Sequence, residues 1–197
     1  MSIVEDVVKV RTPQPRFPVL KTIAKRFSPR IFGTDSIPED HIRSIFEAAR
    51  WTPSGRNNQP WFFYSVKKGT ASYEKIKLCI PNRNGWALSA PLIIIAYYSP
   101  TEPQGTLNKW AQYDLGAAVI SLILQAQELG YYSRQIGSFD LEETKKQFPI
   151  ETPYIPLTLI AMGKIGTEKE YSEYEKTYTE KDLTPTGRKD IVYKELA

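Results

Sequence analysis

The sequence has one cysteine and one histidine among its 197 residues. The lone Cys79 excludes a disulfide within the chain and a cysteine zinc cluster, because both need more than one thiol. The lone His41 excludes a histidine-rich metal site, and a serine–histidine–aspartate triad would depend on this one residue of an ordinary helix. We therefore expect no metal, and we interpret Cys79 as a half-buried thiol and His41 as a helix-surface residue.

Long apolar stretches are absent as well. The longest, residues 91–98, falls far short of the roughly 20 residues that cross a bilayer. Glu5 and Asp6 interrupt the apolar start that a secretory signal would need. The formal charge of +4 comes from 26 basic and 22 acidic residues that are interspersed, so no basic block indicates nucleic acid. We expect a cytoplasmic protein whose partners include no membrane and no nucleic acid.

Apolar residues recur at regular spacings, or in continuous runs, across residues 19–163. Helical spacing predicts helices at 19–27, 38–50 with Ser36 as a candidate cap, 71–78, 113–129 and 141–148, and apolar runs predict strands at 61–66, 92–98 and 156–163. The run at 92–98 is apolar throughout, which predicts a central strand covered on both faces. The helix at 113–129 is apolar on every side, which predicts that it is buried. The irregular alternation favours a mixed sheet flanked by helices, in a single domain spanning 1–197.

The two ends of the chain lack such periods. Residues 4–18 hold three prolines, and residues 167–181 are almost wholly charged or polar apart from three tyrosines. A segment of the second composition cannot pack a core of its own. We interpret residues 1–18 as an N-terminal extension and residues 167–197 as a C-terminal extension that runs over a surface.

Basic and amide side chains stand at positions that suit a phosphorylated cofactor. Arg26 and Arg30 flank a bend at Ser28, and Arg188 is followed by Lys189. Guanidinium groups match phosphate well, although most arginines are solvated surface charges. The loop TPSGRNNQP carries hydroxyl and amide groups that suit a polar ring edge or a ribityl chain, although ordinary turns share this composition. Residue chemistry alone indicates cofactor binding and does not choose the cofactor.

Five short motifs occur in the order found in nitroreductase-family flavoproteins. They are RFSPRIF from Arg26, EAARWTPSGRNNQPW from Glu47, NGWALSAP from Asn84, YDLGAA from Tyr113 and GSFD from Gly137. The chain resembles this family from about residue 21 to residue 163 and again from residue 187. The resemblance implies an α+β fold, with a central, mainly antiparallel sheet flanked by helices. It also implies a homodimer that buries the long helix and exchanges C-terminal segments, so that residues 167–197 pack on the partner subunit.

The same resemblance implies FMN as cofactor and NADH or NADPH as electron donor, with two FMN sites at the dimer interface. By this resemblance, Arg26, Ser28 and Arg188 contact the phosphate and the ribityl chain. Arg30 supplies the positive charge at the pyrimidine edge of the flavin. The loop is expected to contact the FMN of the partner subunit. Asn84 is expected to hydrogen-bond the polar edge of the flavin ring, and the Gly137 amide is expected to lie near flavin N5. The expected cofactor-binding residues are Arg26, Phe27, Ser28, Arg30, Pro53, Ser54, Gly55, Asn57, Gln59, Asn84, Ile136, Gly137, Arg188 and Lys189.

Two positions depart from the family pattern. Thr186 stands where many relatives carry a second basic residue, two before Arg188, and Phe27 stands at a position that is commonly polar or tryptophan. Our hypothesis from the sequence is that Lys189 supplies the missing charge for the phosphate.

The implied function is FMN-dependent reduction of a small electron-poor acceptor, such as a nitroaromatic or a quinone. NAD(P)H would donate hydride through flavin N5 in a ping-pong sequence, so no dedicated catalytic side chain is expected. Fold does not fix reaction, and relatives dehalogenate rings, dehydrogenate peptide heterocycles or fragment flavin. A flavin-storing or regulatory protein and a nucleic-acid binder are further hypotheses, and the last is disfavoured because the aromatics lie in apolar runs. We expect a substrate lid in residues 101–110 or in the polar tail.

Overall fold

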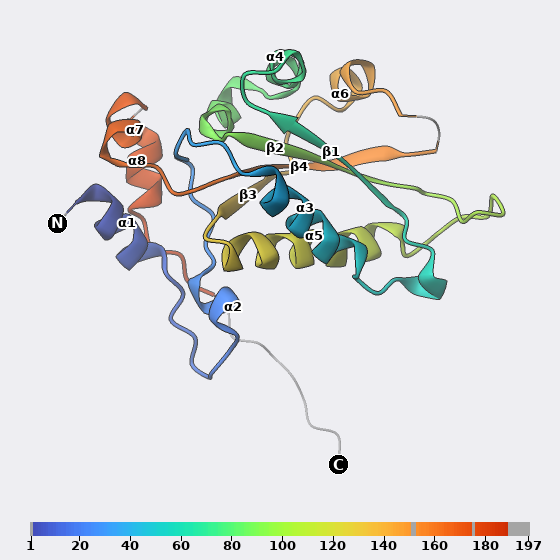
Figure 1. Cartoon of the computed structure of the whole chain (residues 1–197), viewed down its shortest axis with the longest axis horizontal. Coiled ribbons are helices and arrows are strands. Elements are labelled where there is room, and N and C mark those ends of the chain that lie inside the picture. Colours follow the sequence, from blue (N-terminus) through green and yellow to red (C-terminus); the bar gives the residue numbers. More distant parts are fainter. Residues whose placement is uncertain (1, 151–152, 175, 189–197) are drawn as a thin grey trace.

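The computed structural model describes residues 2–150, 153–174 and 176–188. Its helices are α1 (Ile3–Arg11), α2 (Lys21–Lys25), α3 (Glu39–Arg50), α4 (Ala71–Cys79), α5 (Ala111–Glu128), α6 (Leu141–Gln147), α7 (Glu168–Glu173) and α8 (Lys176–Asp182). Two 3-10 helices cover η1 (Gly55–Asn57) and η2 (Asn82–Ser89), and the strands are β1 (Trp61–Lys67), β2 (Leu92–Tyr98), β3 (Tyr132–Ile136) and β4 (Ile155–Gly163). Figure 1 shows α4 and α6 on one face of the sheet and α3 and α5 on the other.

The four strands of the sheet lie in the order β1-β2-β4-β3, and all three pairings are antiparallel. The fold is thus α+β, as the resemblance implies. The central position of β2 is confirmed, because its residues from Leu92 to Tyr97 are buried on both faces. Ile93 and Ile95 belong to the core on the α4 side, whereas Ile94 belongs to the core under α3 and α5.

The long helix α5 is not buried on all sides within one chain, which corrects the sequence prediction. Leu115, Ala118 and Leu122 pack into the core shared with α3. On another face, however, Tyr113 is 74% exposed and Ile120 is 44% exposed. These two residues and the exposed Gly116 between them stand at helical spacing, so they form one apolar stripe that this chain leaves uncovered.

Several local elements differ from the sequence predictions. Residues 3–11 form α1, whose valines are weak helix formers but whose start is stabilised by a capping box of Ser2 and Glu5. Helix α3 starts after Pro38 and not at a cap by Ser36. Strand β3 was not predicted, because its mixed sequence YSRQI shows neither alternation nor an apolar run. Cys79 is fully buried rather than half-buried.

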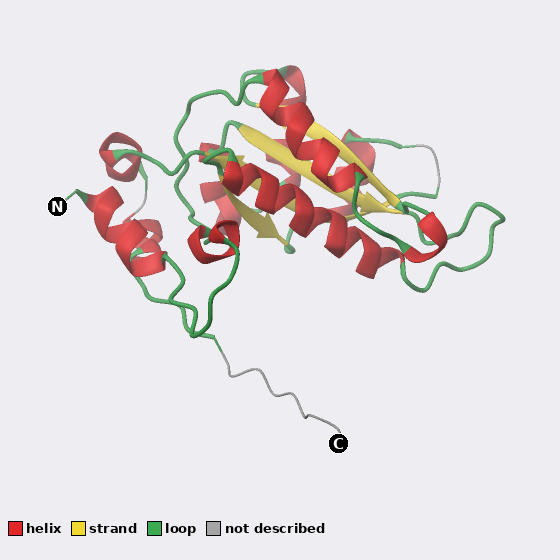
Figure 2. Cartoon of the chain, turned by 60° about the horizontal axis from the view of Figure 1, so that its bottom comes forward, coloured by secondary structure: helices red, strands yellow, loops and turns green. Residues whose placement is uncertain are grey.

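The polar tail, as far as the structure describes it, packs on its own chain. Helices α7 and α8 bury Tyr171, Tyr178 and Asp182, and they lie beside α1 at one end of the molecule (Figures 1 and 2). Burying the tyrosine rings and satisfying their polar groups allows a segment poor in aliphatic residues to pack. Among the described residues, no helix is both long and apolar enough to cross a membrane.

Candidate functional site

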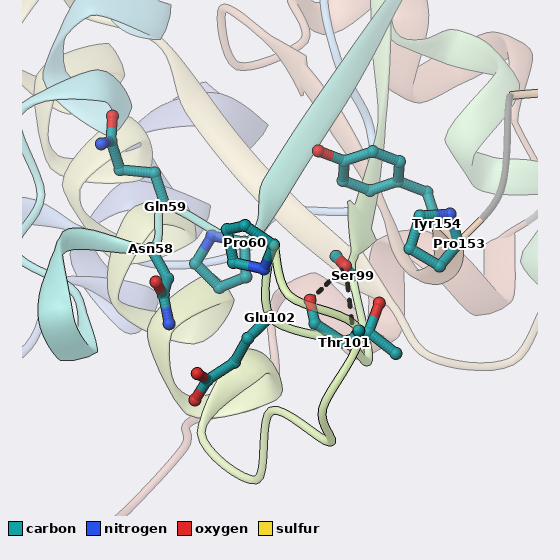
Figure 3. Close-up of a pocket in the computed structure, with 10 residues that line it drawn as sticks. Asn58, Gln59, Pro60, Ser99, Thr101, Glu102, Pro153 and Tyr154 are labelled. Carbon is teal, nitrogen blue, oxygen red and sulfur yellow. Dashed lines mark hydrogen bonds between the residues drawn. The ribbon is translucent and has the colours of Figure 1, made fainter.

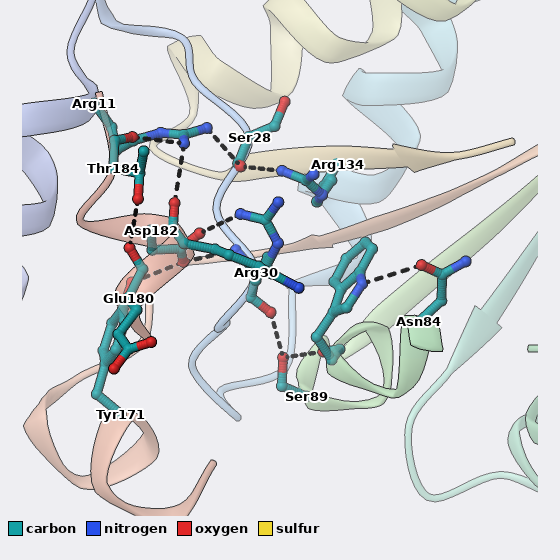
Figure 4. A network of polar contacts seen from close by, with 12 residues as sticks. Arg11, Ser28, Arg30, Asn84, Ser89, Arg134, Tyr171, Glu180, Asp182 and Thr184 are labelled. Carbon is teal, nitrogen blue, oxygen red and sulfur yellow. Dashed lines mark hydrogen bonds and ion pairs between the residues drawn. The ribbon is translucent and has the colours of Figure 1, made fainter. Parts of the chain in front are cut away.

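Three arginines converge on Ser28, at the bend after α2. Arg26 follows the last residue of α2, and its Nη1 donates to the Ser28 hydroxyl at 3.3 Å. The Ser28 carbonyl accepts from Arg134 Nη1 of β3 at 2.7 Å and from Arg11 Nη2 of α1 at 3.4 Å, as Figure 4 shows. Pro29 disfavours helical geometry at Ser28, so α2 does not continue through it, and both oxygens of Ser28 accept hydrogen bonds.

A buried ion pair holds Arg30, two residues further along. The fully buried Asp182, at the end of α8, accepts from the Arg30 amide at 2.8 Å and from Arg30 Nη1 at 3.2 Å. The Tyr171 hydroxyl donates to the same carboxylate at 3.2 Å. The first residues after α2 are therefore tied to the C-terminal helices (Figure 4).

Hydrogen bonds to Ser28 or Asp182 hold Arg11, Arg26, Arg30 and Arg134. Together with the exposed Arg188, whose charge reaches Arg11 and Arg26, we call them the arginine cluster. Burial lowers the pKa of Arg26, and the positive charges of Arg188 and Arg11 lower it further. Burial also lowers the pKa of Arg134 to about 10, with Arg30 as a second cause. Within the described residues, Asp182 is the carboxylate that forms an ion pair with this cluster. Several partly buried cations with one carboxylate among them are suited to hold an anion such as a phosphate.

Asn84 and Gly137 lie beside the cluster. Asn84 Nδ2 donates to the Ser138 carbonyl at 2.7 Å, and Asn84 Oδ1 accepts from Trp86 Nε1 at 3.3 Å. The guanidinium of Arg134 stacks over the Trp86 ring at 5.2 Å. Gly137 is exposed, and a Cβ added there would meet no heavy atom within 4 Å. A flat ligand could therefore reach the Gly137 backbone while its phosphate contacts the arginines.

The loop before β1 is strained at three residues that are not glycine. Arg56, Asn57 and Gln59 have φ angles of 52°, 57° and 45°, in the left-handed region. The loop is held because the Ser54 hydroxyl accepts from the Gln59 amide at 2.9 Å and Asp114 of α5 accepts from the Gly55 amide at 3.1 Å. Backbone strain that is fixed by neighbouring contacts is typical of functional sites.

This loop lies far from the arginine cluster of its own chain. It contacts Asp114 in the first turn of α5, whereas Arg134 comes from β3, which follows the last turn. The 18 residues of α5 span about 27 Å. Figures 1 and 2 show η1 and α2 near opposite ends of that helix. One chain thus brings together Arg26, Ser28, Arg30, Asn84, Gly137 and Arg188, and it leaves Pro53, Ser54, Gly55, Asn57 and Gln59 apart.

A separate hollow of about 310 Å³ lies at the loop's end of the molecule (Figure 3). Gln59 and Tyr154 line it, and so do Thr101, Glu102, Pro103 and Gly105, which belong to the segment 101–110 where a lid is expected. Arg56 Nη1 forms an exposed ion pair with Glu102 at 3.1 Å, which contributes little to stability. None of the residues that line the hollow belongs to the arginine cluster, so we do not place the cofactor there.

The remaining candidates have distinct placements. Phe27 packs its ring against Tyr132 at 4.6 Å, and Ile136 is buried, so both face the core. The Arg188 side chain is exposed, and Lys189 lies outside the described residues. Sequence reasoning missed four residues that hold the site, namely Arg11, Arg134, Asp182 and Asp114. Asp114 could have been identified from the sequence, because it belongs to the YDLGAA motif.

Comparison with known structures first defines the class of protein. A crystal structure described as an oxidoreductase containing FMN is 26% identical, has a TM-score of 0.79 and matches 89% of each chain. A nitroreductase-family protein from Streptococcus pneumoniae, 20% identical with a TM-score of 0.69 over 89% of this chain and 99% of its own, shows the same fold. The α+β architecture described above is therefore that of an established group of structures.

Sequence relatives narrow the class to a family. The Nitroreductase family profile matches residues 23–81 and 81–164. A putative NADH dehydrogenase/NAD(P)H nitroreductase of Archaeoglobus fulgidus is 28% identical over 163 residues, which cover 78% of this chain and 89% of the relative. A putative NAD(P)H nitroreductase of Bacillus subtilis is 24% identical and covers 74% of this chain and 88% of its own. The chain belongs to the nitroreductase family.

Proposed function

We propose that this protein binds FMN and uses NADH or NADPH to reduce small electron-poor acceptors, such as nitroaromatic compounds or quinones. The observation that carries the proposal is the arrangement of the arginine cluster next to Asn84 and the open Gly137. A dianionic phosphate fits the cluster, and a flat ring system fits the open space beside Gly137. Bound FMN would supply the redox chemistry, by accepting hydride at N5 from a nicotinamide and reducing the second substrate.

The side chains of this protein bind and orient the cofactor in the proposed site. Arg26, Ser28 and Arg188 contact the phosphate and the ribityl chain. Arg30 places a positive charge at the pyrimidine edge, where it favours the reduced, anionic flavin. Asn84 hydrogen-bonds the polar edge of the ring, and the Gly137 amide lies near N5. Because the cofactor carries the reaction, the protein needs no nucleophile or metal.

A homodimer would complete this site. The PSGRNNQ loop is separated from the arginine cluster of its own chain by the length of α5, so we infer that Pro53, Ser54, Gly55, Asn57 and Gln59 reach the FMN held by the partner subunit. The exposed stripe of Tyr113, Gly116 and Ile120 supports pairing through α5, because apolar helix faces of this kind mark protein–protein contacts. In this proposal each chain is a single FMN-binding domain.

The visible spectrum of the purified protein tests the proposal. We expect a yellow protein, or a colourless one that takes up FMN, with a flavin band that NADH or NADPH bleaches under anaerobic conditions. Reoxidation by a nitroaromatic or a quinone would complete the cycle. A protein that binds no FMN would refute the proposal. Bound FMN that neither nucleotide reduces would instead favour flavin storage or another reaction on this fold.

A further inference from the structure

Arg11 is a buried cation outside the region that the family profile matches, which begins at residue 23. It is the last residue of α1, and it is only 9% exposed. Its Nη1 donates to the carbonyls of Lys181 at 3.4 Å and Thr184 at 3.3 Å, and its Nη2 donates to the Ser28 carbonyl. Arg11 thus joins the N-terminal extension, the bend after α2 and the C-terminal segment (Figure 4).

The hydrogen bonds of Arg11 do not neutralise it. Among the residues that the structure describes, its three acceptors are backbone carbonyls, and its buried Nε finds no partner. The neighbouring carboxylate, Asp182, already accepts two bonds from Arg30 and one from Tyr171. A desolvated guanidinium without a carboxylate of its own is costly, unless an anion binds close by.

Arg11 also points to the expected phosphate end of the FMN site. It donates to the carbonyl of Ser28, whose hydroxyl accepts from Arg26. Arg188 lies near enough for its charge to affect the pKa of both Arg11 and Arg26. The segment from Lys181 to Thr184, which Arg11 holds, leads directly to Arg188. Two residues before Arg188, where the family resemblance implies a second basic residue, stands Thr186.

We propose that Arg11 supplies the second positive charge for the FMN phosphate, in place of the basic residue that Thr186 replaces. Its guanidinium acts through charge, and it positions Ser28 and the segment that carries Arg188. This inference rests on the proposed FMN site, and it assigns a ligand-binding role to the N-terminal extension. It is an alternative to the sequence-based hypothesis that Lys189, which lies outside the described residues, restores the missing charge.

The test compares binding of FMN with binding of riboflavin, which lacks the phosphate. In Arg11→Met we expect FMN affinity to fall about tenfold or more, as for loss of a charge-assisted contact, and riboflavin affinity to change less than about threefold. FMN binding should also depend less steeply on salt. Arg11→Lys, which keeps the charge, should retain most of the preference for FMN. Lys9→Met removes an exposed charge from the same helix and should leave both affinities unchanged.

A purely structural role would give a different pattern. If Arg11→Met weakened FMN and riboflavin equally, or weakened neither, the inference would be wrong. Should this variant fail to fold, Arg11→Gln decides, because it keeps amide donors for the carbonyls and removes the charge. Loss of the FMN preference in Lys189→Met but not in the Arg11 variants would also overturn it. Wild-type protein that binds neither flavin would refute the proposed function itself.

Discussion

Asp182 is the residue on which the arrangement of Arg30 depends most. Its carboxylate accepts from the Arg30 amide, the Arg30 guanidinium and the Tyr171 hydroxyl at a fully buried position. Removing it would leave three donors without their acceptor, and one of them is charged. Breaking a buried pair in this way costs about 3 kcal/mol or more.

We therefore expect Asp182→Ala to lower the free energy of unfolding of the FMN-free protein by about 3 kcal/mol. The matched control is Asp140→Ala, which removes the exposed cap of α6 and should cost about 1 kcal/mol. Urea unfolding, followed by tryptophan fluorescence at one protein concentration, measures both. Equal losses for the two variants would contradict the role that we give to Asp182.

From the sequence, residues of the candidate site could be grouped only where the signal was local. Arg26, Ser28 and Arg30 lie in one short motif, and the structure brings them together with Asn84, Gly137 and Arg188. Their roles toward FMN remain predictions. The residues that hold Ser28 and Arg30 could not be found in this way. Arg134 and Asp182 contact Ser28 and Arg30 across 106 and 152 residues, and Arg11 contacts Lys181 across 170 residues, separations that only the tertiary fold bridges.

At the scale of elements, the exposed stripe on α5 has a direct test. Ile120→Glu places a charge in the proposed dimer contact, so we expect a monomer by light scattering at micromolar concentration. Because the partner's loop would then be absent, FMN affinity should fall at least about tenfold. Leu78→Glu, at an exposed apolar residue of α4 on the other face of the sheet, is the control and should leave the dimer intact. A dimeric, FMN-replete Ile120→Glu protein would refute the proposed interface.

Replacing glycine by alanine should have opposite outcomes for stability at Gly163 and at Gly137. A Cβ on Gly163, at the end of β4, would stand 2.6 Å from Cδ of Pro91, and the rigid ring cannot turn away. We expect Gly163→Ala to destabilise the protein by about 1–3 kcal/mol. Gly137→Ala meets open space and should change stability by less than about 0.5 kcal/mol. Thermal unfolding of the FMN-free variants distinguishes them, and similar midpoints would contradict the steric argument.

Helices and strands whose apolar residues repeat clearly were predicted well from the sequence, and the other elements were missed. The apolar run of β2 and the periods of α3, α4 and α6 agree with the structure, because burial on one or both faces leaves a repeating pattern. Strand β3 has no such pattern, whereas the short helical period of α1, at Ile3, Val4, Val7 and Val8, was overlooked in the sequence. Strand β3 forms because it pairs with β4, and α1 combines a capping box with contacts to α7. The period of α5 was recognised, but sequence could not show that one of its apolar faces stays uncovered.

For the whole molecule, the proposed site predicts complementation between defective subunits. Ser54→Tyr would block the loop, and Arg26→Ala would weaken the phosphate end, so each homodimer should bind FMN poorly. A mixed dimer has one site with both defects and one site with neither. After refolding together in equal amounts, random pairing should restore about a quarter of the wild-type FMN sites, measured by flavin absorbance. No recovery would show that loop and arginine cluster serve the same subunit's site.

The strained loop has a consequence for how this protein can change under selection. At Arg56, Asn57 and Gln59 the backbone is left-handed, a conformation that costs glycine less free energy than it costs any of these residues. A library selected for heat resistance alone should therefore collect glycine at these three positions, while flavin-dependent turnover declines in the same clones. Selection for turnover should restore the original side chains. At this loop, a gain in thermal stability would thus cost catalytic activity, and the reverse.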